Sequence, residues 1–336
     1  MLRSLARARR VLFIGGKGGV GKTTVATATA LAAAREGRRV LLVSTDPAHN
    51  LGHLWGCEIG ARVRRLAPNL DGLELDPEQT ARAHLEEVGA ALRKLMPEHL
   101  GAEVDRHMAL SRETPGMHEA AMLERIAELV EQGDRDHDLL VFDTAPSGHT
   151  ARLMALPEMM SAWVDGMLHR QSRSRHFGEV LRGLGRDDDV GRQAIGAVEG
   201  GRARGAGDPA DARDDRIRSL LNRRRHRFEH LREVLADRER TAFVIVLTAE
   251  RLPVLETLEL HAQLQRAGIH VGGLVVNKRS PLDAGEFLAH RAALEAGHLE
   301  ELARSLPGVP LLELPLLPGE PVGRDALEAF SARLAG

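Results

Sequence analysis

The sequence predicts an α/β fold in which a mostly parallel sheet is covered by helices. Short apolar runs of strand length alternate with longer segments that show helical spacing, the order expected of strand–helix–strand units. These runs are apolar at nearly every position, which is typical of strands buried on both faces. The chain has 336 residues, enough for one large domain that carries an insertion. We therefore expect a single domain over residues 1–336, with ligands bound at the carboxyl ends of its strands.

The first predicted strand and helix flank a glycine-rich loop. Arg10–Ile14 is an apolar run followed by two glycines, and an alanine-rich stretch extends from Thr23 to Glu36. Gly37 is expected to end this helix. Four later apolar runs predict the other strands of the sheet, at Val40–Val43, Leu139–Phe142, Phe243–Leu247 and Gly273–Val276.

Two regions interrupt the alternation of strands and helices. Asp76–Val130 and Leu153–Arg240 lack strand signals, so we expect a helical subdomain inserted at about 76–130 and 151–240. Within the second region, 183–215 is rich in Gly, Arg, Asp and Ala and has almost no large apolar residues. Such a composition cannot bury enough surface to order itself, which predicts a flexible loop.

Amphipathic helices are expected on both sides of that loop. After it, apolar residues recur at helical spacing, at Ile217, Leu220, Leu221, Phe228, Leu231 and Leu235. The basic run Arg223–Arg227 on this helix is expected to lie on a solvated face; the alternative is contact with acidic lipid or a partner. Before the loop, Leu, Met and Trp residues between Leu153 and Leu168 form a similar stripe, which is typical of a core; the alternative is an adaptable surface for apolar clients.

Composition and charge exclude several classes of protein. Lys and Arg number 46 against 48 Asp and Glu, so we expect no binding to nucleic acid through a general basic surface. Cys57 is the only cysteine, which rules out an intrachain disulfide and a cysteine-based zinc site. No apolar stretch reaches the roughly 18 to 20 residues of a membrane span. We therefore expect a soluble, cytoplasmic protein.

The glycine-rich loop matches a motif for binding phosphates. Gly16-Lys17-Gly18-Gly19-Val20-Gly21-Lys22-Thr23 fits G-x-x-x-x-G-K-[ST] and lies between a predicted strand and a predicted helix, the context that the motif requires. Backbone N–H groups of such a loop converge on phosphate oxygens at the positive end of the helix dipole. Lys22 is then expected to contact the β and γ phosphates, and Thr23 to bind Mg²⁺. The loop Gly15–Thr24 therefore predicts a site for ATP and Mg²⁺ in a P-loop nucleotide hydrolase.

Two aspartates are expected at the same edge of the sheet as this loop. Asp143 follows the strand Leu139–Phe142 and is the expected Mg²⁺-binding acid, acting directly or through water. The loop 144–150 that comes next is suited to sensing the γ phosphate. Asp46 follows the second strand, where a carboxylate could orient or deprotonate the attacking water; a helix N-cap is the alternative. Thr23, Asp46 and Asp143 are thus the candidate metal residues.

Three segments together resemble the family of arsenite-pump ATPases, which includes the cytosolic ATPases that deliver tail-anchored membrane proteins. The segments are Gly16–Thr24, in which Lys17 is an additional lysine of a deviant Walker A motif, Ser44–Asn50 and Asp143–Thr150. The likeness extends over nearly the whole chain, through Thr248–Glu250 with Glu256-Thr257, Val275–Lys278 and Pro315–Glu320.

The resemblance implies a role for each matching residue. Asp46 would activate the water, Glu250 would contact the nucleotide, and Asn277 would contact adenine. The segment Pro315, Leu316, Leu317 would lie against the base. Lys17 would reach the phosphates of a second subunit, as an arginine finger does. Because the chain has one P-loop, the active form would be a homodimer. The site residues are then Gly16, Lys17, Gly18, Gly19, Val20, Gly21, Lys22, Thr23, Thr24, Asp46, Asp143, Glu250, Asn277, Pro315, Leu316 and Leu317.

Departures from the family pattern bear on partners. The zinc-binding Cys-x-x-Cys of the tail-anchor members would lie around 287–297, where this chain has no cysteine, so no structural zinc is expected. Cys57 alone cannot supply the several thiolates of a metalloid site. The leading function is an ATPase that drives a membrane pump or carries apolar membrane-protein clients. The alternatives are a nucleotide-gated positioning or partitioning scaffold that binds a membrane or a partner protein, and an ATPase with neither transport role.

Overall fold

A computed structural model describes residues 1–46, 50–95, 101–112, 116–144 and 209–335. Its strands form one sheet in the order β3-β4-β2-β5-β1-β6-β7-β8, and every neighbouring pair except β3 and β4 is parallel. The strands are β1 (Val11–Gly16), β2 (Val40–Ser44), β3 (Arg64–Ala67), β4 (Leu70–Glu74), β5 (Leu139–Asp143), β6 (Thr241–Leu247), β7 (Val271–Arg279) and β8 (Leu311–Pro315). The predicted α/β fold with a mostly parallel sheet is confirmed.

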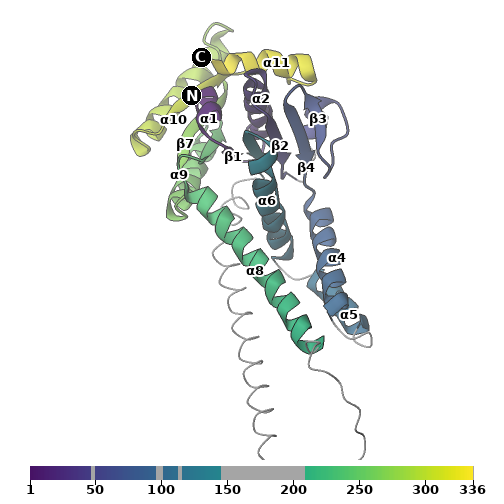
Figure 1. The fold of residues 1–336 in the computed structure, drawn as a ribbon. Helices are drawn as coiled ribbons and strands as arrows, with labels where there is room; N and C mark the ends of the chain where they lie inside the picture. Colours follow the sequence, from purple (N-terminus) through teal and green to yellow (C-terminus); the bar gives the residue numbers. More distant parts are fainter. Residues whose placement is uncertain (47–49, 96–100, 113–115, 145–208, 336) are drawn as a thin grey trace, which may run out of the picture.

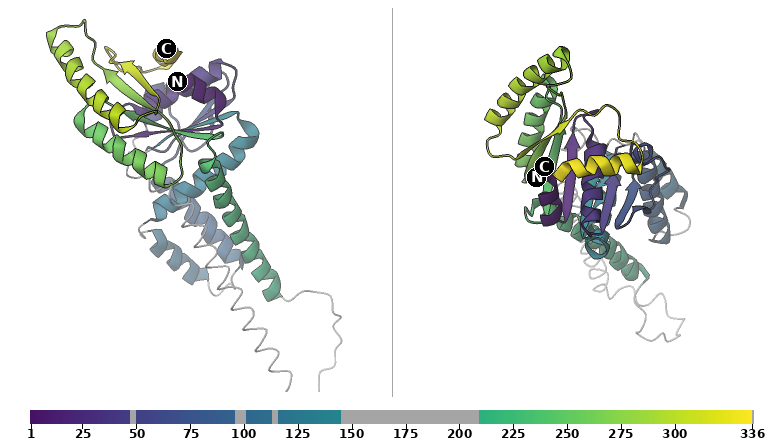
Figure 2. Two further views of the ribbon diagram at one scale, coloured as in Figure 1. Left: turned by 90° about the vertical axis from the view of Figure 1, so that its left-hand side faces the viewer. Right: turned by 90° about the horizontal axis from the view of Figure 1, so that it is seen from above.

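Helices cover both faces of this sheet (Figure 1). They are α1 (Leu2–Ala8), α2 (Lys22–Arg35), α3 (Asn50–Trp55), α4 (Pro77–Leu95), α5 (Gly101–Arg112), α6 (Met117–Asp136), α8 (Pro209–Ala236), α9 (Arg251–Arg266), α10 (Glu286–Ser305) and α11 (Arg324–Ala332), with a 3₁₀ turn at Arg333–Ala335. Helices α1, α2, α3 and α11 pack on one face, and α6, α8, α9 and α10 pack on the other. Seen from above, α11 lies across the domain beside α2 (Figure 2).

Alternating side chains of the central strand divide the core into two layers. Val11 and Phe13 of β1 pack into one layer, and Leu12 and Ile14 pack into the other. Phe13 stacks on the ring of Phe142 at a centroid distance of 4.8 Å, so neighbouring strands are also joined by aromatic contacts. Burial on both faces explains why the central strands are apolar at nearly every position.

The helical part projects away from the sheet. Helices α4, α5, α6 and α8 extend together beyond one edge of the α/β core (Figures 1 and 2). Contacts between α4 and α5, α4 and α6, and α6 and α8 hold this layer together. No helix in the part of the chain that the structure describes is both long enough and apolar enough to cross a membrane.

The structure describes only the last part of the loop expected at 183–215. Residues 209–215 belong to α8 rather than to a flexible loop, and the helix begins at Pro209, whose fixed φ suits a first helical position. The rest of the expected loop, the segment 145–150 and the apolar stripe 153–168 lie outside the described residues.

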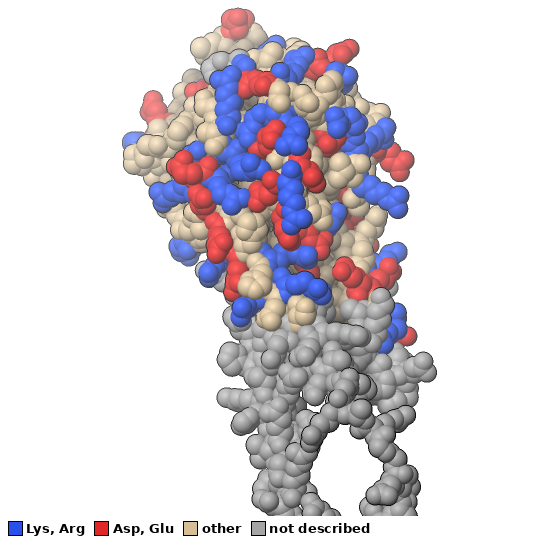
Figure 3. Space-filling view, in the orientation of Figure 1, with Lys and Arg blue, Asp and Glu red and all other residues tan. Residues whose placement is uncertain are grey.

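The basic run on α8 does not simply face solvent. Arg224 Nε lies 3.1 Å from a Glu124 carboxylate oxygen, and Arg227 pairs with Glu128 at 2.8 Å and Glu131 at 3.3 Å. These arginines face the acidic side of α6 because α8 packs along it. On the face that presents α8, basic and acidic side chains are interspersed (Figure 3).

Candidate functional site

The P-loop connects β1 to α2 at the centre of the sheet, where close backbone approaches require glycine. Gly16 has a φ of 144°, and a Cβ there would come within 2.1 Å of the Val246 carbonyl oxygen. Gly21 has a φ of 90°, and a Cβ there would meet the Asn277 amide at 2.4 Å. Both positions combine a positive φ with no room for a side chain, so geometry requires glycine at 16 and 21.

Lys22 and Thr23 lie at the first turn of α2. They are close to Asp143, at the end of β5, and to Asp46, just after β2. Lys22 is 4% exposed and its Nζ donates a hydrogen bond to the Lys17 carbonyl oxygen at 3.1 Å. Burial lowers the pKa of its ammonium, while the Asp143 and Asp46 carboxylates oppose that shift. The positive charge therefore lies close to both aspartates, at the N-terminus of the helix.

Asp143 ends β5 and is completely buried. Burial raises its pKa to about 7, against the hydrogen bond from the Thr23 hydroxyl and the charge of Lys22, which lower it. Ser44 Oγ lies 3.3 Å from its Oδ2, whereas its Oδ1 is buried and has no hydrogen-bond partner. An unsatisfied carboxylate oxygen beside a threonine hydroxyl is a suitable pair of ligands for Mg²⁺, which prefers oxygen.

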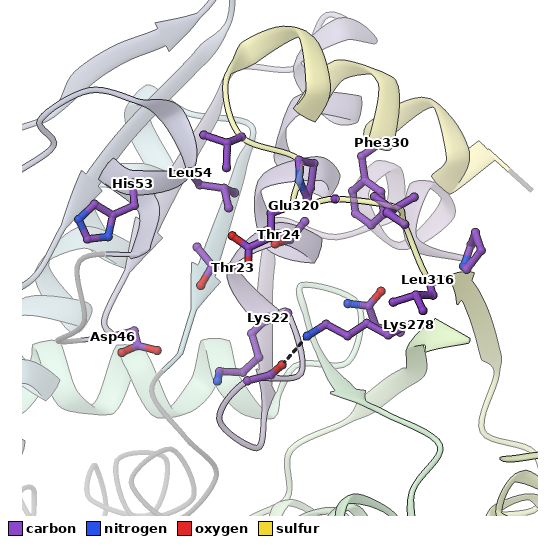
Figure 4. Close-up of a pocket in the computed structure, with 18 residues that line it drawn as sticks. Lys22, Thr23, Thr24, Asp46, His53, Leu54, Lys278, Leu316, Glu320 and Phe330 are labelled. Carbon is purple, nitrogen blue, oxygen red and sulfur yellow. Dashed lines mark hydrogen bonds between the residues drawn. The ribbon is translucent and has the colours of Figure 1, made fainter. Parts of the chain in front are cut away.

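Asp46 follows β2 and is half-buried at the same edge, with its backbone N–H 3.4 Å from Ser44 Oγ. Its side chain points toward the hollow that also receives Lys22 and Thr23 (Figure 4). The carboxylate stands across this hollow from the P-loop backbone. This is a position from which it could orient water toward a terminal phosphate.

A cavity of about 580 Å³ extends from these residues toward the C-terminal segment. Its volume is in the range of a nucleotide-sized ligand. One end is polar and contains the P-loop, and the other is lined by side chains from the end of β7, the end of β8 and the segment that follows β8. The lining residues are Gly19, Gly21, Lys22, Thr23, Thr24, Asp46, His53, Leu54, Asn277, Lys278, Pro315, Leu316, Leu317, Gly319, Glu320, Pro321, Val322 and Phe330.

A second hollow lies on the other side of the P-loop. It has a volume of about 420 Å³ and contains Lys17, Gly18, Glu250 and Arg291, together with Leu252 and Leu316. Lys17 Nζ pairs with Glu256 of α9 at 3.0 Å, and Arg291 pairs with Glu250 at 2.9 Å. Glu256 of the same chain therefore holds the Lys17 ammonium, and Lys17 does not line the cavity that contains Lys22.

Most of the residues singled out from the sequence line one of these two hollows, whereas Gly16 and Asp143 line neither. Asp46, Asn277 and the segment Pro315–Leu317 lie around one cavity with the P-loop residues Gly19 and Gly21–Thr24. Lys17, Gly18, Val20 and Glu250 line the neighbouring hollow instead. The Asn277 side chain is 6% exposed, and its Nδ2 donates to the Val20 carbonyl oxygen at 2.9 Å, which joins β7 directly to the P-loop.

Sequence reasoning did not assign His53, Leu54, Lys278, Glu320, Val322 or Phe330 to the site. The first two belong to α3 and reach the cavity because the backbone N–H of Gly323 donates to the Leu54 carbonyl oxygen at 2.8 Å. That bond joins segments nearly 270 residues apart, which no local pattern reveals. Lys278 and Glu320 had an available signal, since they end the segments Val275–Lys278 and Pro315–Glu320 that carry the family resemblance.

A glycine loop that leads from a central parallel strand into a helix, with a buried lysine, a threonine and an orphaned carboxylate beside it, defines a P-loop nucleotide hydrolase. The family model described as anion-transporting ATPase matches residues 9–336. The chain therefore belongs to the anion-transporting ATPase family, and its activity is the hydrolysis of ATP.

Relatives of known sequence agree with this assignment. The chain is 29% identical over 323 residues to a putative arsenical pump-driving ATPase 2 of Aquifex aeolicus, covering 96% of this chain and 98% of that protein. It is 30% identical over 333 residues to the ATPase GET3 of Podospora anserina, covering 98% and 91%. It is also 29% identical over 323 residues to an arsenical pump-driving ATPase of Escherichia coli, covering 94% of this chain but 48% of that longer protein.

Proposed function

We propose that the 580 Å³ cavity binds Mg-ATP and that hydrolysis there depends on Mg²⁺. The observation that carries this proposal is the buried Oδ1 of Asp143, which has no hydrogen-bond partner and lies on the carboxylate next to the Thr23 hydroxyl. An isolated buried carboxylate oxygen is costly unless a ligand satisfies it. Thr23 and Asp143, with Asp46 nearby, would hold Mg²⁺, which neutralises charge on the β and γ phosphates when bound.

The residues of the chain have distinct tasks in this proposal. The deviant Walker A backbone, Gly16–Thr24, cradles the phosphates, and Lys22 contacts the β and γ positions from a buried site that water does not screen. Asp46 takes the proton of the attacking water or orients that water in line. Asn277 and Pro315–Leu317 line the far end of the cavity, where the base would lie.

We further propose that the active form is a homodimer in which Lys17 completes the site of the other subunit. In the single chain, Lys17 is tied to Glu256 and lines the second hollow rather than the cavity with Lys22. Its side chain and that of Glu256 are 35% and 33% exposed, so water screens the pair and leaving it costs little. A partner's phosphates would then replace Glu256 as the counter-charge, as in arginine-finger catalysis.

Coupling of hydrolysis to a membrane task is proposed from the relatives. Two of them are named as arsenical pump-driving ATPases and another as ATPase GET3. We propose that nucleotide state moves the helical layer of α4, α5, α6 and α8, and that this layer acts on a membrane pump or on apolar membrane-protein clients in the cytoplasm. Cys57 is half-buried and is the only cysteine, so no activation by antimonite is expected.

The Mg²⁺ proposal is tested by replacing Thr23 with an isostere. Thr23→Val removes the hydroxyl but keeps the shape, and we expect it to need at least about tenfold more Mg²⁺ for half-maximal hydrolysis. Thr27→Val is the matched control, because Thr27 is on the same helix and its buried hydroxyl has no hydrogen-bond partner. Equal Mg²⁺ requirements for Thr23→Val, Thr27→Val and the wild type would contradict the proposal.

The membrane task is tested by capture with an ATP-locked form. Asp46→Asn, loaded with Mg-ATP, is used to recover partners from the membrane and soluble fractions of the producing cells. Recovery of a protein with many membrane spans supports a pump, and recovery of proteins with a single C-terminal apolar segment supports a carrier. Recovery of neither, with ATP bound, would contradict the coupling while leaving the ATPase site intact.

A further inference from the structure

Lysine is rare in this protein and is concentrated at the nucleotide site. The chain has four lysines and 42 arginines. Lys17 and Lys22 belong to the P-loop motif, and Lys278 is the third lysine of the site. Arg and Lys are not interchangeable, because the ammonium is a compact charge on a flexible stem whereas the guanidinium is a rigid fork. A lysine at 278 in so arginine-rich a chain points to a role for this side chain.

The backbone of Lys278 has an uncommon conformation. Its φ is 60°, and Asn69 is the only other non-glycine residue with positive φ in the described part of the chain. Residues that carry a Cβ enter this region at an energetic cost, and they persist there only when their surroundings hold them. The register of the β7–β8 pairing shifts between Val276 and Arg279, so the regular hydrogen-bond pattern is interrupted at Lys278, as in a β-bulge.

Both neighbours of Lys278 are anchored. On one side, the Asn277 Nδ2 donates to the Val20 carbonyl oxygen at 2.9 Å. On the other side, Arg279 pairs with Glu313 at 2.6 Å and with the buried Glu295, which also accepts a hydrogen bond from the Ser280 backbone N–H at 3.0 Å. The conformation of Lys278 is therefore imposed by contacts that it does not itself make.

This conformation directs the Lys278 side chain toward the P-loop. Its Nζ donates a hydrogen bond to the Gly19 carbonyl oxygen at 2.9 Å (Figure 4). Lys278, Gly19 and Leu316 line both the cavity that contains Lys22 and the hollow that contains Lys17. The hydrogen bond between Lys278 and Gly19 thus forms part of the wall between the two spaces.

We propose that Lys278 is a nucleotide-positioning residue with two separable parts. Its methylene stem forms one side of the slot for a purine base. Its ammonium holds the Gly19 carbonyl group and thereby stabilises the backbone conformation of the P-loop between Lys17 and Lys22. The stem offers apolar contact to either purine, so it orients the base without choosing between adenine and guanine. This inference rests on the proposed binding of nucleotide in the 580 Å³ cavity.

Two substitutions separate the stem from the ammonium. Lys278→Met keeps an unbranched apolar stem and removes the charge, and Lys278→Ala removes both. Binding of ATP and of tripolyphosphate, which lacks the base, is measured by calorimetry for both variants. Lys94→Ala, which changes the one lysine outside the site, is the control.

We expect Lys278→Met and Lys278→Ala to weaken tripolyphosphate binding equally, by about two- to fivefold, since both lose the hydrogen bond to Gly19. ATP binding should separate them, with Lys278→Ala weaker than Lys278→Met by about tenfold, the effect of losing two or so methylene groups from contact. Equal ATP affinities in the two variants would overturn the role of the stem. Wild-type tripolyphosphate affinity in both would overturn the role of the ammonium.

A failure of the underlying site gives a different result. If the wild type binds neither ATP nor tripolyphosphate, the nucleotide cavity is wrongly assigned. The role of Lys278 in positioning the base is then overturned together with it. Thermal unfolding without ligand tests the backbone independently. Lys278→Gly should unfold at a higher temperature than Lys278→Ala, because glycine adopts positive φ freely. An equal or lower unfolding temperature would contradict the imposed conformation, and Lys278→Gly replaces Lys278→Ala in the binding series if alanine prevents folding.

Discussion

The two edges of the parallel sheet differ in the kind of charged group that they bury. At the carboxyl edge, Asp143 keeps a buried oxygen without a partner, Lys278 has a positive φ, and Lys22 is buried with its charge. At the amino edge, where β1, β2, β5 and β6 begin, arginines are bonded to carbonyl groups and carboxylates. At the amino edge, Arg9, His137 and Arg240 also each have a buried nitrogen without a partner, and Asn69 has a positive φ. What distinguishes the carboxyl edge is a buried carboxylate oxygen without a partner beside a buried ammonium, a pair expected where a ligand binds, whereas arginines tie the amino edge together.

Arg38 shows how the amino edge is held. Its Nη1 donates to the Arg9 carbonyl oxygen at 2.9 Å, and its guanidinium also donates to the carbonyl groups of Ala6 and Asp138. Arg10 donates to the carbonyl oxygens of Asp134 and His137 at 3.0 Å and 3.1 Å. The Arg38 guanidinium thus joins α1 to the segments that lead into β1 and β5. These contacts are made within the protein and do not involve the nucleotide cavity.

The largest effect is expected at the carboxyl edge, for Asp46→Asn. The variant should bind ATP with wild-type affinity and hydrolyse it about a hundredfold or more slowly, because the amide cannot take a proton from water. Binding is measured by calorimetry and turnover by phosphate release. Unchanged turnover would remove Asp46 from the mechanism and would weaken the contrast between the edges.

A smaller effect of a different kind is expected at the amino edge, for Arg38→Ala. Loss of this guanidinium leaves carbonyl groups of Ala6, Arg9 and Asp138 without their donor, which should lower the free energy of unfolding by roughly 2 to 3 kcal/mol. ATP affinity should not change. Urea denaturation and ATP calorimetry check both statements.

The matched control is Arg39→Ala, the neighbouring and more exposed arginine that pairs with Asp138. It should destabilise the protein less than Arg38→Ala does. A change in ATP affinity for Arg38→Ala, or equal destabilisation by both variants, would show that the amino edge is not the structural edge described above.

How far the sequence predicts this structure differs between the elements. The five apolar runs became β1, β2, β5, β6 and β7 because buried parallel strands have an unmistakable composition. The edge strands β3 and β8, and β4 beside β3, were not predicted. Strand β3 reads Arg64-Arg65-Leu66-Ala67, with both arginines exposed, so it has no apolar run. The turn between β3 and β4 contains Asn69 with a φ of 59°, a signal that the sequence did contain in Pro68-Asn69.

The candidate site shows the same division. The phosphate end is local, because the motif Gly16–Thr23 and the strand-end acid Asp143 can be recognised from neighbouring residues. The opposite end is assembled from α3, β7 and the segment after β8, so its side chains come together only through long-range packing. The separation of Lys17 from Lys22 into different hollows also depends on the position of α9, whose Glu256 holds Lys17.

The smallest effect is expected for the pH dependence of the Arg39–Asp138 pair. Hydrogen bonds from Arg39 lower the pKa of Asp138 from 3.8 to about 2. Because the folded-state pKa is below the unfolded value, the pair stabilises the protein above about pH 4 and loses this effect as the pH falls toward 2. The Arg39 and Asp138 side chains are 56% and 37% exposed, so solvent screening should keep the contribution under about 1 kcal/mol.

This prediction is checked with Asp138→Asn. The difference in free energy of unfolding between wild type and variant should be small at pH 6 and should narrow as the pH is lowered from 4 to 3. A difference that widens on acidification would reverse the sign and contradict the assigned ion pair.

The central claim is that the carboxyl edge of one chain forms an incomplete site that Lys17 of a second chain completes. Lys17→Ala and Asp46→Asn chains, each nearly inactive alone, are mixed in equal amounts and ATP hydrolysis is measured. If Lys17 acts across the dimer, half of the dimers are mixed and each has one complete site, so about a quarter of wild-type activity should return. If Lys17 serves its own P-loop, every site in the mixture lacks one of the two residues. Activity that stays at the level of the separate variants would contradict the shared site.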